Sequence, residues 1–193
     1  MNPEPKRQWS ADLARSVANG LIELLEPHCL PGMLCYAGSL RRGKAMVGDA
    51  EICYVSKIKP LRKPGEMFES PCLVAEEFIG RLLGGKLEAR PSTDGIRTWG
   101  DKNKLALHKA TGLPVDLFRE PDPEDWWRTL VIRTGPKELN LRLIAGAERQ
   151  GLRLHAYGPG FTRRETGEIV PCRSEREVFE VCGIEYLDPH ERR

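Results

Sequence analysis

The sequence predicts an α/β (α+β) fold, and three observations support this prediction. The chain has 193 residues, of which 40% are hydrophobic and 30% are charged, so it can bury a core without metal or disulfide support. Segments with helical periodicity alternate with segments of strand periodicity, and glycine or proline stands at many of their ends. No apolar run approaches the roughly 18 residues that a membrane-spanning helix needs, so we expect no membrane partner.

The first part of the chain is predicted to contain one helix, two strands and a loop. Apolar residues at helical spacing follow Ser10, a good N-cap, and predict a helix that ends before Pro27. Met33–Ala37 is a predicted strand, and a second strand over residues 49–54 is indicated by alternating apolar and polar side chains. Residues 57–69 are predicted to form a basic, proline-bearing loop.

The rest of the chain is predicted to alternate between the two kinds of element. We expect helices over residues 72–83, 122–130, 136–149 and 174–182, and strands over residues 86–90, 105–108, 114–118 and 152–157. In the last helix Ser174 and Glu177 have the spacing of a capping box. The best candidate for a domain boundary is Thr134-Gly135, which separates residues 1–133 from residues 134–193.

Charge and cysteine content give weaker information about function. The formal net charge is +2, too small to indicate a nucleic-acid-binding protein, so any basic surface must come from local clustering. The N-terminal segment has no apolar stretch of the kind a secretory signal contains. The 6 cysteines include no Cys-x-x-Cys pair, so we expect reduced thiols and a cytoplasmic protein.

The most informative segment runs from Gly38 to Ile52. Gly38 allows the backbone to approach a ligand closely, and the Ser39 hydroxyl and the amides that follow can bind phosphate oxygens. Arg42 and its basic neighbours add positive charge beside this turn. A Gly-Ser turn with this composition, between two predicted strands, therefore predicts a phosphate-binding site.

Acidic residues next to this turn predict a metal site. Asp49 and Glu51 are two positions apart on a predicted strand, so their side chains share a face. Asp116 is the acid in an otherwise apolar strand, where its burial is costly unless a cation pairs with it. The alternative is a solvated strand face for the first two and a sheet edge for the third. The Gly-Ser turn upstream favours a site for magnesium or manganese.

Three motifs resemble known families. The order Gly38-Ser39, Asp49-x-Glu51 and a later Asp116 resembles the nucleotidyltransferase superfamily. Residues 133–140 resemble the Thr-Gly-Ser…Asn junction between palm and thumb in the X family of DNA polymerases, which includes polymerase beta and terminal transferase. Residues 174–193 resemble the acidic helix, aromatic-bearing strand and basic tail that end members of that family.

The resemblance implies a fold and a set of site residues. It implies a nucleotidyltransferase palm over residues 1–133, with a mixed, largely antiparallel sheet flanked by helices, and a small thumb over residues 134–193. Asp49, Glu51 and Asp116 would be catalytic and would hold two Mg²⁺ or Mn²⁺ ions. The implied nucleotide-binding residues are Gly38, Ser39, Arg42, Gly48, Thr134, Gly135 and Asn140. The implied nucleic-acid-binding residues are Arg133, Lys137 and Arg142.

The implied activity is transfer of a nucleotide from a (deoxy)nucleoside triphosphate to a DNA 3′-hydroxyl, by a monomeric polymerase suited to gaps or ends, as in DNA repair. The length leaves no room for the lyase and fingers domains of larger members, so we expect a minimal form such as some viruses and phages encode, acting in the host cytoplasm. Its partners would be a nucleoside triphosphate and DNA, either a primer-template or gapped DNA.

Departures from the family pattern keep two alternatives open. Glu51 stands where these polymerases usually carry aspartate, Ile132-Arg133 replaces an aromatic pair, and Pro114 replaces a basic residue that often stands two positions before the third acid. One alternative is a nucleotidyltransferase that is template-independent or acts on RNA, protein or a small molecule. The other is an inactive nucleic-acid-binding relative.

Overall fold

The computed structural model describes residues 7–62, 67–92, 95–96, 98–156 and 158–192. The helices are α1 (Ala11–Leu25), α2 (Gly38–Arg41), α3 (Val74–Leu82), α4 (Trp126–Thr134), α5 (Lys137–Arg149) and α6 (Glu175–Val181). The strands of the first part are β1 (Trp9–Ser10), β2 (Cys29–Tyr36), β3 (Met46–Val47), β4 (Ala50–Ser56), β5 (Ile58–Leu61), β6 (Ser70–Leu73), β7 (Leu87–Ala89), β8 (Asn103–His108) and β9 (Leu113–Arg119). Those of the last part are β10 (Leu152–Leu154), β11 (Phe161–Arg163) and β12 (Ile169–Val170).

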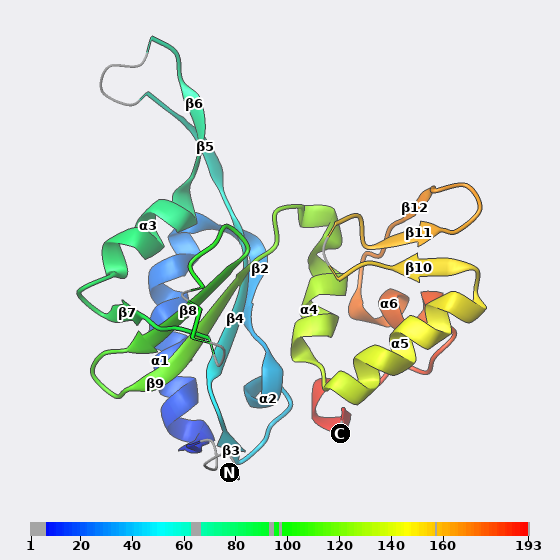
Figure 1. Cartoon of the computed structure of the whole chain (residues 1–193), viewed down its shortest axis with the longest axis horizontal. Helices are drawn as coiled ribbons and strands as arrows, with labels where there is room; N and C mark the ends of the chain where they lie inside the picture. Colours follow the sequence, from blue (N-terminus) through cyan, green and yellow to red (C-terminus); the bar gives the residue numbers. More distant parts are fainter. Residues whose placement is uncertain (1–6, 63–66, 93–94, 97, 157, 193) are drawn as a thin grey trace.

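A five-stranded sheet in the order β2-β4-β9-β8-β7 forms the centre of the first part. Only the β4–β9 pair is parallel, and the other three pairs are antiparallel. The prediction of a mixed, largely antiparallel sheet flanked by helices is therefore confirmed. Figure 1 shows α1 and α3 on one side of the sheet and α4 on the other.

The two faces of the sheet have different chemistry. On the face toward α1 and α3, residues such as Ile52 and Leu117 belong to the larger apolar core. On the opposite face, Cys53 and Phe118 pack with Trp126 and Leu130 of α4. Glu51 and Asp116 alternate with Ile52 and Leu117 along their strands, so both acids lie on the face toward α4. The sheet thus presents its acids to the side where the C-terminal part of the chain stands.

The C-terminal part has a core of its own, built by α5, α6 and the β10-β11-β12 sheet. Leu139 and Leu143 of α5 pack there with Phe179 of α6. Gly146 allows the close approach of α5 to the end of α6, because a Cβ at this position would overlap the carbonyl oxygen of Cys182. Figure 1 shows this part beside the sheet, with α4 between them.

Most predicted elements are present, and the N-cap of α1 is confirmed by the hydrogen bond from Leu13 N to Ser10 Oγ, 3.3 Å long. At α6 Ser174 Oγ accepts from Glu177 N as predicted, but the Glu177 carboxylate accepts from the backbone of Arg173 instead of that of Ser174. The capping box is therefore only half formed. Within the described residues, no helix is both long and apolar enough to cross a membrane.

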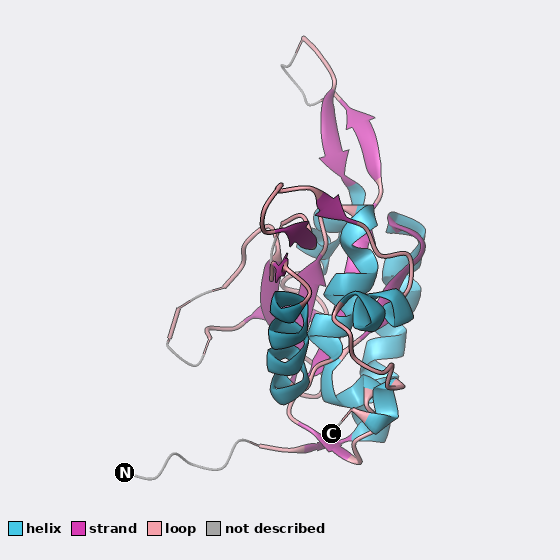
Figure 2. Ribbon diagram, turned by 90° about the vertical axis from the view of Figure 1, so that its right-hand side faces the viewer, coloured by secondary structure: helices cyan, strands magenta, loops and turns pink. Residues whose placement is uncertain are grey.

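The predicted basic loop over residues 57–69 is wrong in part, because β5 and β6 form a two-stranded antiparallel ribbon. Pro60 pairs with Pro71 in this ribbon, and proline in both strands removes the signal by which a strand is recognised. The ribbon projects beyond the body of the protein (Figure 2). Lys63, one of the basic residues expected in this loop, lies outside the described residues.

Candidate active site

The three predicted acids lie on or directly before two neighbouring parallel strands. Asp49 immediately precedes β4, Glu51 is the second residue of β4, and Asp116 is in the middle of β9. Glu51 and Asp116 are register partners in the β4–β9 pair. Residues that are opposite each other in adjacent strands have side chains on the same face. A parallel pairing between distant segments therefore brings the third acid beside the Asp49-x-Glu51 motif.

Glu51 is the acid with the most perturbed environment. Burial, followed by the negative charges of Asp49 and Asp116, raises the pKa of the Glu51 carboxyl from 4.5 to about 7, while Arg133 and Arg42 act in the opposite direction. These are the two effects that disfavour a carboxylate, desolvation and like charge. A cation placed among these acids would favour the ionised form.

Gly38 explains how the Glu51 carboxyl reaches its position. The backbone of Gly38 has a φ of 58°, which glycine adopts at little cost. A Cβ at this position would overlap the Glu51 carboxylate. Glycine is thus required both by the turn into α2 and by the close contact between this turn and the acid.

Asp116 is held by an arginine that the sequence did not single out. Arg90 follows β7, and its Nη2 donates to Asp116 Oδ1. The same guanidinium donates through Nε to the carbonyl oxygen of Ala106, at 3.2 Å. This ion pair joins residues 26 positions apart, so no local pattern in the sequence indicates it.

The acids suit a divalent cation by their chemistry, although they are not gathered into one ligand set. Carboxylate oxygens are the ligands that Mg²⁺ and Mn²⁺ prefer. The raised pKa of Glu51 reflects burial first and then repulsion by neighbouring acids, and a cation would relieve that repulsion. In the described part of the chain, no group of three or more His, Cys, Asp or Glu side chains converges enough to hold an ion. The donor set therefore fits the metal, but Asp116 is turned to Arg90.

A cleft of about 470 Å³ lies beside these acids, between the palm-like and thumb-like parts. It brings together 10 of the 13 predicted site residues. These are Gly38, Ser39, Arg42, Gly48, Asp49, Glu51, Arg133, Gly135, Lys137 and Asn140. Gln8, Ile132 and Pro136 also line the cleft and were not predicted as site residues. Asp116, Thr134 and Arg142 are not among the lining residues.

Thr134 lies beneath the cleft and is fully buried. Its hydroxyl donates to the carbonyl oxygen of Leu130 at 2.6 Å and accepts from Arg41 Nη1 at 2.9 Å. Its own carbonyl oxygen accepts a hydrogen bond from Arg42 Nη1. Arg41 also forms an ion pair with Glu175 of α6. Residues of α2 therefore tie the Gly-Ser turn to both α4 and α6, and Arg142 is exposed on α5, outside this network.

Two residues that line the cleft each have a buried side-chain atom without a hydrogen-bond partner within the described structure, Arg42 Nε and Asn140 Oδ1. Asn140 Nδ2 donates to the carbonyl oxygen of Ile132 at 2.9 Å, which fixes the side-chain amide. Buried polar atoms without partners are rare in native structures. Both atoms are closed off from solvent, so each becomes a candidate contact for a bound molecule, as a donor and as an acceptor respectively, only when its side chain turns toward the cleft.

Arg133 lies over the floor of the cleft. Its guanidinium stacks on the Phe118 ring, 3.8 Å from the ring centre, and donates to Asn103 Oδ1 at 3.3 Å. Its positive charge opposes the rise in the pKa of the nearby Glu51 carboxyl. In the present conformation Arg133 thus interacts with side chains of the sheet.

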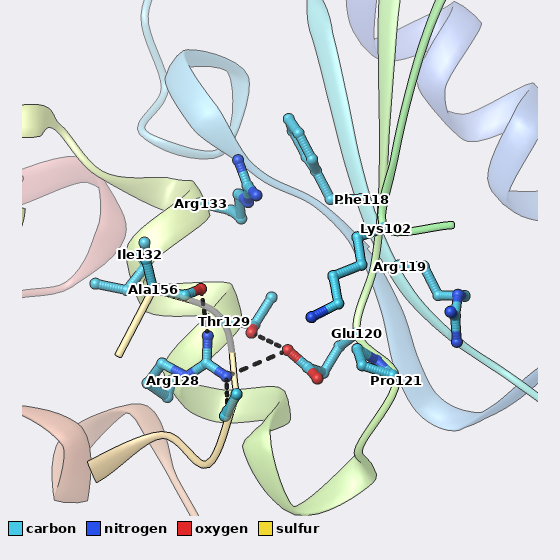
Figure 3. A pocket seen from close by; sticks show the side chains of 11 residues that line it. Lys102, Phe118, Arg119, Glu120, Pro121, Arg128, Thr129, Ile132, Arg133 and Ala156 are labelled. Atoms are coloured by element: carbon cyan, nitrogen blue, oxygen red, sulfur yellow. Dashed lines mark hydrogen bonds and ion pairs between the residues drawn. The ribbon is translucent and has the colours of Figure 1, made fainter. Parts of the chain in front are cut away.

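A second, small pocket of about 10 Å³ lies where β9 leads into α4. Figure 3 shows Arg128 and Thr129 of α4 pointing toward Glu120, with which both form hydrogen bonds. Arg128 also donates to the carbonyl oxygens of Ala156 and Gly158, both at 3.0 Å. A space of this size holds at most about one water molecule. The residues around it therefore serve to connect the two parts of the protein through hydrogen bonds.

Comparisons with known proteins agree with this architecture. The family model described as DNA polymerase beta thumb matches residues 129–193. DNA polymerase lambda of Rattus norvegicus is 24% identical over 179 residues, which cover 84% of this chain and 29% of that protein. The chain therefore spans less than a third of the length of this relative.

The fold and the cleft define a palm-like sheet joined to a thumb-like domain. The two matches extend this class to a relationship with the X family of DNA polymerases. The resemblance recognised in the sequence is thereby confirmed. The chain is therefore related to DNA polymerases of this family, and the roles of its individual site residues remain predictions.

Proposed function

We propose that this chain transfers a nucleotide from a (deoxy)nucleoside triphosphate to the 3′-hydroxyl of DNA, as a gap-filling polymerase. The observation that carries the proposal is the single cleft in which the Gly-Ser turn, two of the three acids and the Gly135–Asn140 segment meet. The relationship to X-family polymerases supports nucleotides and DNA as its substrates. The products would be an extended DNA strand and pyrophosphate.

The residues of the cleft divide into two groups in this proposal. Ser39 and Arg42 bind the triphosphate, with Arg42 exchanging its bond to the Thr134 carbonyl oxygen for a phosphate oxygen. The backbone at Gly135 lies against the sugar, and the buried, unpartnered Asn140 Oδ1 turns toward the cleft to accept a hydrogen bond from the base. Arg133, Lys137 and Arg142 contact the nucleic acid.

The acids bind two divalent cations in this proposal. Such ions, when bound, acidify the attacking hydroxyl and neutralise the triphosphate. Asp49 and Glu51 would hold them from β4, and Asp116 from β9. Asp116 also orients the 3′-hydroxyl, which requires its carboxylate to turn from Arg90 toward the other acids.

A second candidate, an inactive nucleic-acid-binding relative, is favoured by one observation. Among the described residues the acids form no converged ligand set, and the Asp116 carboxylate is already in an ion pair with Arg90. An inactive protein would keep the cleft and the thumb without turnover. A template-independent or non-DNA nucleotidyltransferase would keep the turnover but not the need for a template.

One assay separates these candidates. Gapped DNA, nicked DNA and single-stranded DNA are each offered with one nucleotide at a time, with and without Mg²⁺ or Mn²⁺. The proposal predicts metal-dependent, template-matched addition on gapped DNA, reduced by orders of magnitude in Asp116→Asn but with nucleotide binding retained. Metal-dependent addition without a template would support the other transferase, and nucleotide or DNA binding without addition would support the inactive relative.

A further inference from the structure

Arg90 reaches Asp116 from two strands away. Its backbone N donates to the carbonyl oxygen of Leu105 on β8, at 2.9 Å. Leu105 is in turn the register partner of Asp116 on β9. The side chain therefore crosses β8 along the face that carries the acids.

The guanidinium is fixed at three points. Its Nε donates to the carbonyl oxygen of Ala106 at 3.2 Å, its Nη1 to that of Pro91 at 3.4 Å, and its Nη2 to Asp116. The side chains of Arg90 and Asp116 are only 18% and 13% exposed. A planar donor group held by backbone carbonyls has little freedom to follow the carboxylate. Movement of Asp116 toward Glu51 would therefore lengthen or break its bond to Arg90.

We propose that Arg90 is a positioning residue that competes with divalent cations for the Asp116 carboxylate and holds it in a resting orientation while the metal is absent. This inference rests on the proposed function, since it assigns Asp116 to the metal. The competition follows from charge, because Arg90 and a cation both need the same carboxylate and repel each other. It also explains why the acids, two of them register partners, form no converged ligand set in the described chain.

The competition predicts that removal of Arg90 tightens metal binding. Arg90→Gln keeps a hydrogen-bonding side chain but removes the charge, and we expect it to lower the Kd for Mn²⁺ by about tenfold, since a charge-assisted hydrogen bond no longer opposes binding. Arg90→Lys keeps the charge but cannot make the three planar contacts. We expect its Kd for Mn²⁺ to lie between those of the wild type and Arg90→Gln. Because it keeps the buried positive charge, Arg90→Lys can replace Arg90→Gln in the test if Arg90→Gln does not fold.

The test is a titration of each purified protein with MnCl₂, in which the electron paramagnetic resonance signal of the free ion is measured without nucleotide or DNA. Arg81→Gln is the matched control, because Arg81 forms an exposed ion pair with Glu77 on α3, and its affinity should equal that of the wild type. The gain from Arg90→Gln should disappear in an Asp116→Asn background. Thermal melting of every variant identifies those that fold.

Two results would overturn the inference. One is a folded Arg90→Gln, or a folded Arg90→Lys where Arg90→Gln does not fold, that binds Mn²⁺ no more tightly than the wild type. The other is a gain that persists with Asp116→Asn. The proposed function fails separately, if Mn²⁺ binding in the wild type is absent or insensitive to Asp49→Asn. If the wild type binds no Mn²⁺ and Arg90→Gln gains no site, both proposals are refuted.

Discussion

Glu51→Gln should stabilise the metal-free protein at neutral and alkaline pH, although it removes an acid of the candidate active site. Burial and the neighbouring Asp49 and Asp116 raise the pKa of the Glu51 carboxyl from 4.5 to about 7. Between these two values the folded protein binds more protons than the unfolded chain. Stability therefore falls as the pH rises through this window, and the loss is complete above about pH 7.

The magnitude follows from the difference between the two pKa values. A rise from 4.5 to about 7 corresponds to about 3 kcal/mol, at about 1.4 kcal/mol for each pH unit. The residue is only partly buried, and solvent screening lowers this figure. We therefore expect Glu51→Gln to raise the free energy of unfolding by about 1.5–3 kcal/mol at pH 8 and by less than about 1 kcal/mol at pH 5, where Glu51 is protonated in the folded protein.

Urea denaturation at the two pH values, in buffer with EDTA, measures this difference. Glu23→Gln is the matched control, because Glu23 is an exposed glutamate on α1, and its effect should be small and equal at both pH values. A ligand that binds the folded state adds stability, so Mg²⁺ should stabilise the wild type at pH 8 and Glu51→Gln less. Equal effects of Glu51→Gln at pH 5 and pH 8 would refute the conclusion that the pKa of Glu51 is raised in the folded protein.

Four further predictions concern ligands, DNA and the fold. Arg42→Ala should weaken nucleoside triphosphate binding by about 1.5–3 kcal/mol in calorimetric titrations, as expected for a charge-assisted hydrogen bond; unchanged affinity would place the triphosphate elsewhere. DNA affinity should fall with salt with a logarithmic slope on the order of −3 to −5, from three to five phosphate contacts, and a slope near zero would indicate a different acceptor. Because Ile132-Arg133 replaces an aromatic pair, ribonucleotides should be used within roughly 10–100-fold of deoxyribonucleotides in single-nucleotide kinetics, about 1.4–2.7 kcal/mol, and a preference above about a thousandfold would contradict this. Gly146→Ala should lower thermal stability because its Cβ overlaps the Cys182 carbonyl oxygen, whereas Gly20→Ala in α1, with nothing within 4 Å, should raise stability by about 0.5–1 kcal/mol; the reverse order would show that α5 and α6 do not pack this closely.

Local sequence signals predicted most of the helices and strands. Ser10 and Ser174 mark the starts of α1 and α6 through hydrogen bonds that span three residues, which is why the pattern could be read from the sequence. The helix predicted over residues 122–130 instead continues to Thr134. Its last turn is held by contacts to Arg41 of α2 and to Arg42, which follows α2. Both arginines are about 90 positions away, so these contacts leave no local pattern.

The parts of the candidate site that could be predicted are those in which a short run of residue types is characteristic of a phosphate or metal site. The Gly-Ser turn and the Asp49-x-Glu51 pair lie within one short segment, and ten predicted residues line one cleft. Arg90 and Gln8 could not be found in this way. Gln8 reaches the cleft because it directly precedes β1, which pairs with β3 beside the Gly48 turn. A strand of two residues has no periodicity by which it could be predicted.

The charges that surround each acid could not be predicted from the sequence. Each acid on β4 and β9 is accompanied by an arginine from another element: Arg133 of α4 and Arg42 near α2 act on Glu51, and Arg90 after β7 binds Asp116. The net charge of +2 hides this local balance. In the metal-free protein the arginines offset repulsion between the acids. A divalent cation would take over that role, and the arginines facing the cleft would then be available to phosphate groups. The same positive charges that stabilise the resting site are thus the ones that the proposed reaction needs.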